Sequence, residues 1–115
     1  MKSRVKVITF PVLCDYIVHV EVTTDMNATF KKYKTPREDW KEEYDNGNAF
    51  TIRAKSNPVT FIFVRPNVST GTIAHECWHA VVNIFEYVGA NIDNELMAYH
   101  LGYLTNEVFQ LVRNK

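Results

Sequence analysis

Residues 59–89 read VTFIFVRPNVSTGTIAHECWHAVVNIFEYVG, a strand pattern followed by a helix pattern. The run Val59–Val64 is apolar on both faces, which predicts a strand in the centre of a sheet. A helix is expected to begin near Ser69 or Thr70, whose hydroxyls can cap backbone N–H groups, and to end at Gly89. Its apolar positions repeat with the helical period: Ile73, Cys77, Val81, Ile84, Phe85 and Val88.

Three further strands are predicted before this stretch. They are Val5–Phe10, the alternating segment Tyr16–Thr23, and Ala49–Lys55, which would form a hairpin with the central strand. His19 lies on the polar side of the second strand, so we expect a solvated surface histidine. The polar segment before the hairpin could contain a short helix at Pro36–Tyr44, with proline in its first turn.

A second long helix is expected to begin between Asn91 and Asp93 and to end near Val112. Because few residues join it to the preceding helix, the two should pack antiparallel. Strands followed by helices argue for an α+β domain. We therefore predict one domain over residues 1–115, with a mostly antiparallel sheet of about four strands and two antiparallel helices.

Composition excludes several classes of function. Lys and Arg number 13, as do Asp and Glu, so no net field favours nucleic acid or a membrane surface. No apolar run has the length of a membrane span, and the first residues lack an apolar core, so we expect no signal peptide. A disulfide between Cys14 and Cys77 would constrain the motif described next, so we expect free thiols and a cytoplasmic location.

The helix contains the HExxH pattern His75-Glu76-Cys77-Trp78-His79. Histidines four residues apart lie one turn from each other on the same face, so both rings can bind one tetrahedral ion. Glu76 projects beside them, where it can accept a proton from water activated by the metal without being a ligand. The alternative is two polar residues on an exposed helix face.

A catalytic zinc site needs three protein ligands and one open position. Glu95 opens the next helix, fifteen residues separate it from His79, and an antiparallel return could bring it towards the histidines. The alternative is an acid favoured at a helix N-terminus by the helix dipole. Gly102, on the same face, would let the helices approach closely. Tyr99 and His100 are candidate oxyanion donors, with Tyr99 preferred for the inner position.

The HExxH motif followed by a helical Asn-Glu-x-x-Ala resembles the gluzincin metallopeptidases, the thermolysin-like group, over roughly residues 48–103. The resemblance implies a minimal zincin-like domain in which His75, His79 and Glu95 hold one zinc ion. It also implies that Glu76 is the catalytic base. Many gluzincins have an aspartate four residues after the glutamate ligand, whereas this chain has tyrosine, which would support a histidine ligand more weakly.

The leading functional interpretation is a zinc-dependent peptidase acting on an extended peptide or protein. Asn48-Ala49-Phe50 resembles the edge strand to which substrates of thermolysin-like enzymes add. Residues 98–104 resemble small HExxH proteins of phage genomes, which would place the protein in the host cytoplasm. The alternative is a catalytically weak or inactive metallopeptidase-like domain that binds metal and a protein partner. A partner could also complete a cleft that this short chain leaves shallow.

Overall fold

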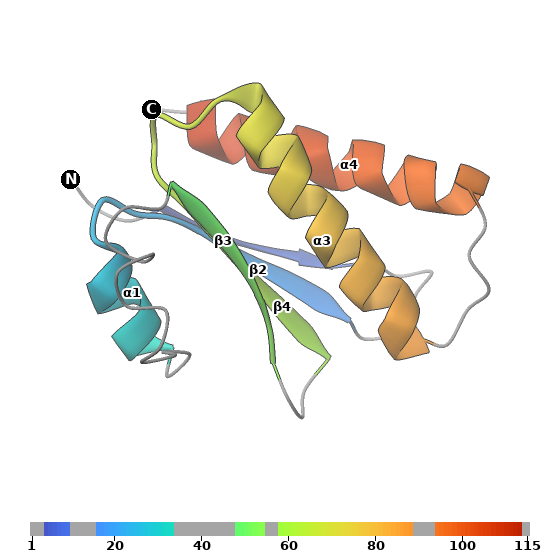
Figure 1. Cartoon of the computed structure of the whole chain (residues 1–115), viewed down its shortest axis with the longest axis horizontal. Helices are drawn as coiled ribbons and strands as arrows, with labels where there is room; N and C mark the ends of the chain where they lie inside the picture. Colours follow the sequence, from blue (N-terminus) through green and yellow to red (C-terminus); the bar gives the residue numbers. More distant parts are fainter. Residues whose placement is uncertain (1–3, 10–15, 34–47, 55–57, 89–93, 114–115) are drawn as a thin grey trace.

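The computed structural model describes residues 4–9, 16–33, 48–54, 58–88 and 94–113. It confirms the α+β class and the four predicted strands (Figure 1). The elements are β1 (Arg4–Thr9), β2 (Ile17–Val22), α1 (Met26–Lys32), β3 (Ala49–Arg53), β4 (Val59–Val64), α3 (Thr70–Val88) and α4 (Asn94–Arg113). The described residues thus hold three helices, one more than the two expected. The segment Pro36–Tyr44, a predicted short helix, lies outside them.

The sheet is mixed, with strand order β1-β2-β4-β3. β1 and β2 pair antiparallel, as do β3 and β4, and β2 pairs parallel with β4. The hairpin of β3 and β4 and the central place of β4 are as predicted. A parallel pair needs a crossover connection, and the chain passes through α1 and β3 between these two strands. β1 and β3 form the two edges.

Helices α3 and α4 cover one face of the sheet, and α1 lies on the other (Figure 1). The main core lies under α3 and α4. Its fully buried members come from alternate residues of the strands and from one stripe of each helix: Val18, Val20, Val22, Ile62, Val64, Ile73, Cys77, Ala80, Val81, Ile84, Leu104 and Val108. Burial raises the pKa of the Cys77 thiol to about 12, so this side chain is a neutral thiol that packs as a small apolar group.

The smaller core lies between α1 and the opposite face of the sheet. Met26 and Phe30 of α1 pack on Phe63 of β4. The helix begins at an N-cap, Asp25, whose carboxylate accepts a hydrogen bond of 3.0 Å from the backbone N–H of Ala28. Both faces of β4 are therefore covered, which explains why its sequence is apolar on both faces.

The long helices do not lie side by side as expected. Figure 1 shows α4 crossing α3 at a wide angle. α3 packs on β3 and β4, and α4 packs on β1 and β2. A Cβ atom added to Gly102 would meet nothing within 4 Å, so the predicted close approach at this glycine is wrong. No helix within the described residues is long and apolar enough to cross a membrane.

Candidate metal centre

The two motif histidines lie together on the outward face of α3. Their Nε2 atoms are 3.2 Å apart, and the side chain of His75 is 67% exposed. Two ligands of a tetrahedral zinc ion, each about 2.05 Å from it, would be separated by about 3.3 Å. The same distance suits a hydrogen bond between the two rings. The pair His75 and His79 therefore has the spacing of two zinc ligands and is open to an ion from solvent.

Glu76 points towards β3 and is only 8% exposed. The hydroxyl of Thr51 in β3 donates to Glu76 Oε1 over 2.6 Å and lies 3.1 Å from the main-chain carbonyl oxygen of Glu76. The second carboxylate oxygen, Oε2, is 4.0 Å from His75 Nε2. The carboxylate thus lies between the edge strand and the histidine pair.

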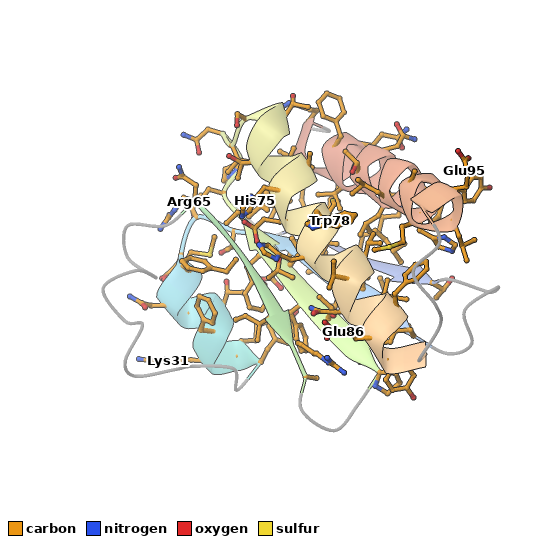
Figure 2. The ribbon with its side chains drawn as sticks, turned by 45° about the vertical axis from the view of Figure 1, so that its right-hand side comes forward. Lys31, Arg65, His75, Trp78, Glu86 and Glu95 are labelled. Carbon is orange, nitrogen blue, oxygen red and sulfur yellow. The ribbon has the colours of Figure 1, made fainter. Side chains whose placement is uncertain are left out.

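The structure does not bring Glu95 to the histidines. Figure 2 shows Glu95 at the outer end of α4 and His75 on the opposite side of α3. Among the residues with described positions, no three His, Cys, Asp or Glu side chains form a group that could hold a metal ion. The reason is helix length: α3 continues to Val88, nine residues or roughly 13 Å beyond His79. The ligand role of Glu95 stays a prediction.

The two candidate oxyanion donors lie on different faces of α4. Tyr99 is 74% exposed, whereas His100 is buried and makes an edge-to-face ring contact with Phe85. The Nδ1–H group of His100 donates to the carbonyl oxygen of Leu96 over 2.8 Å. The role of Tyr99 as an oxyanion donor stays a prediction. The buried stripe of α4 passes through His100: Met97, His100, Leu104, Val108 and Val112.

The outer edge of β3 presents backbone groups beside this site. The backbone N–H of Arg65 donates to the oxygen of Asn48, and that of Ala54 donates to the oxygen of Val59. In an antiparallel ladder, residues whose N–H and C=O groups bond to the partner strand alternate with residues whose groups point away from it. Between Asn48 and Ala54, every second residue of β3 therefore bonds to β4. The N–H and C=O groups of Thr51 and Arg53 consequently point away from β4, towards the outer edge.

A second polar cluster, which sequence reasoning missed, lies on the face covered by α1. Tyr33 donates to Glu21 Oε1 over 2.6 Å, and Lys32 Nζ is 3.1 Å from the same oxygen. His19 Nε2 lies 2.8 Å from the Tyr33 hydroxyl; because that hydroxyl gives its hydrogen to Glu21, His19 donates to it. Glu21 is fully buried and His19 half-buried against Phe61, so the prediction of a solvated His19 is wrong.

Burial sets the charge states in this polar cluster. Desolvation lowers the pKa of His19, although Glu21 partly offsets the shift. Desolvation also raises the pKa of Tyr33, and the hydrogen bond to Glu21 adds to that effect. The hydrogen bond with Glu21 raises the pKa of Lys32. The cluster therefore favours an ion pair of Lys32 with Glu21, a neutral Tyr33 and a neutral His19.

No protein-family model, no curated protein and no solved structure matches this chain. The chemically distinctive feature of the described residues is the pair of histidines with a buried carboxylate beside them.

Proposed function

We propose that this protein is a zinc-dependent hydrolase with a minimal zincin-like architecture, and that peptides are its substrate class. His75 and His79 hold one zinc ion, and Glu76 is the general base. The observation that carries the proposal is the 3.2 Å separation of the two Nε2 atoms with the Glu76 carboxylate next to them. Zinc in such a site supplies a Lewis acid that makes water nucleophilic at neutral pH.

The two carboxylate oxygens of Glu76 have different roles in the proposed mechanism. Glu76 Oε1 is occupied by the Thr51 hydroxyl, and Oε2 is the oxygen nearer to His75. Oε2 is therefore the atom that takes the proton from the attacking water. Glu95 as third ligand requires the first turn of α4 to approach α3. The proposal gives no role to Tyr99, whose side chain points to solvent.

One observation favours a second candidate, a metal-binding domain that holds a protein partner without turnover. The described residues do not assemble a third ligand around the histidine pair. A site without three protein ligands does not match the pattern of catalytic zinc enzymes. The two candidates differ in what Glu76 must do, because only hydrolysis requires a base.

Zinc content tests the shared part of both candidates. After dialysis, elemental analysis should find about one zinc ion per chain, and His79→Ala should remove most of it. Glu95→Gln should weaken zinc binding at least tenfold if Glu95 is a ligand. Glu86→Gln, which changes another exposed helical acid, is the matched control. Full zinc occupancy in His79→Ala would show that the histidine assignment is wrong.

Replacement of the base separates the two candidates. Glu76→Gln keeps the size of the side chain and its ability to accept the Thr51 hydrogen bond, but it cannot take a proton at neutral pH. We expect it to retain zinc and to lose cleavage of an unfolded protein substrate. Equal cleavage by wild type and variant would exclude the peptidase mechanism. Zinc retention without cleavage in the wild type would favour the interaction domain.

The proposed binding surface is the outer edge of β3, to which an extended peptide would add by main-chain hydrogen bonds. Arg53→Pro deletes one N–H that points outward and leaves Thr51 in place. Arg53→Ala is the control, because it loses the ion pair with Glu86 but keeps the N–H. KM for an unfolded substrate should rise several-fold in the proline variant alone. Equal KM values would place the substrate elsewhere.

A further inference from the structure

The hydrogen bond between Thr51 and Glu76 joins an edge strand to the candidate base. We propose that Thr51 is a positioning residue: its hydroxyl fixes the Glu76 carboxylate in register with a peptide bound at the outer edge of β3. This inference rests on the function proposed above and concerns how the base is aimed. It assigns Thr51 no contact with the reacting atoms.

The geometry at the hydroxyl shows which contact dominates. Thr51 has one hydroxyl hydrogen and two acceptors within reach, Glu76 Oε1 at 2.6 Å and the Glu76 carbonyl oxygen at 3.1 Å. A hydrogen bond to a charged acceptor is the shorter and stronger of such a pair, so the hydrogen goes to the carboxylate. Elsewhere in the described chain, no side chain donates a hydrogen bond to this carboxylate.

The hydrogen bond therefore limits the rotation of the Glu76 side chain. With Oε1 attached to β3, Oε2 lies on the side of the carboxylate that faces His75, at 4.0 Å from Nε2. Thr51 is itself β-branched, which restricts its own χ1 rotation and makes its hydroxyl a rigid attachment point. The contact is also largely shielded from water, because Glu76 is buried.

The backbone of the same residue takes part in the proposed binding edge. Neighbouring residues of β3 bond to β4, so the N–H and C=O groups of Thr51 point outward. Its side chain, in contrast, points towards Glu76 of α3. A peptide paired with the Thr51 backbone would consequently have its position along the strand and its distance from the base set by one residue.

Two substitutions separate this role from simple packing. Thr51→Val keeps the shape and strand preference of the side chain but removes the hydroxyl, and Thr51→Ser restores the hydroxyl. A misplacement of about 1 Å in a catalytic group can cost on the order of 100-fold in rate. We expect kcat of the zinc-loaded valine variant to fall at least tenfold on an unfolded protein substrate, with KM within twofold, and serine to recover most of kcat. Thr9→Val, an exposed threonine in the other edge strand, is the matched control.

Zinc content and crystal structures complete the experiment. Zinc per chain should be equal in wild type and Thr51→Val, and Glu76 should leave β3 only in the valine variant. Unchanged kcat in Thr51→Val, no recovery with serine, or a Glu76 carboxylate that keeps its place without the hydroxyl would each overturn the inference. Thr51→Ala gives the same comparison if valine does not fold. Absent zinc or an active Glu76→Gln would instead refute the proposed function, and the crystal structures would still decide what holds the carboxylate.

Discussion

The buried carboxylate of Glu21 allows a quantitative test of how α1 is held on the sheet. Tyr33→Phe removes only the hydroxyl that donates to Glu21 over 2.6 Å and accepts from His19 over 2.8 Å. Loss of a hydrogen bond to a charged, buried acceptor costs about 1.5–3 kcal/mol. Lys32 still contacts the carboxylate in the variant, so we expect a loss near the middle of this range, about 2 kcal/mol.

This loss is large enough to measure by thermal or urea unfolding. The unfolding entropy of a domain of this size is roughly 0.24 kcal/mol per kelvin, so about 2 kcal/mol lowers Tm by about 8 °C. The urea midpoint should fall with an unchanged m-value. Tyr99→Phe, at an exposed tyrosine, is the control and should stay within about 0.5 kcal/mol. A Tyr33→Phe variant as stable as this control would refute the energetic role of the cluster.

Two further predictions concern stability. Burial lowers the pKa of His19 below 6.5, so the unfolded chain binds the proton more tightly; stability is complete above about pH 6.5 and falls as the pH decreases below it. His19→Gln should remove that part of the pH dependence in urea unfolding between pH 7 and 5, and an unchanged slope would contradict it. Gly102→Ala should raise stability by about 0.5–1 kcal/mol, because the added methyl group meets open space on a helix; a lower Tm would show that the site is crowded.

The sequence predicted those parts of the fold that depend on local patterns. The strands follow from alternation, and the β3–β4 hairpin follows from closeness in the chain. The face of α3 that is buried follows from its apolar period, including the fully buried Ile73 and Cys77. Each of these features is set by residues fewer than about twenty positions apart, where periodicity carries the information.

Features that depend on distant contacts were not predictable in the same way. The parallel pairing of β2 with β4 joins segments about forty residues apart, such as His19 and Phe61. Helix α1 is only 7 residues long, and its burial depends on contacts of Phe30 with the strands rather than on a strong helical period. Because α1 covers the polar side of β2, Glu21 is buried there. Its carboxylate then needs hydrogen-bond partners, which Lys32 and Tyr33 at the end of α1 supply.

In the candidate site, too, local relations were predictable from the sequence and distant ones were not. The two histidines and the proposed base, Glu76, lie within about one helical turn, so their relation could be derived from spacing alone. The place of Glu95 depended on the length and rotation of two helices. The buried stripe that includes Met97 and Leu104 was present in the sequence and indicates which face of α4 is inward. Tyr99, four residues after Glu95, lies with it on the outward face. The buried stripe was the signal that sequence reasoning missed.

Retention of zinc therefore carries more information here than in a preassembled site. Two histidines alone should exchange their metal during dialysis, whereas three protein ligands hold it, as the coordination of catalytic and structural zinc sites indicates. A zinc ion that survives dialysis would mean that a third ligand reaches the pair, either from the start of α4 or from another acidic side chain. The comparison of Glu95→Gln with Glu86→Gln then shows whether Glu95 is that third ligand. Replacement of a ligand lowers zinc affinity, whereas replacement of an exposed acid that is not a ligand leaves it unchanged.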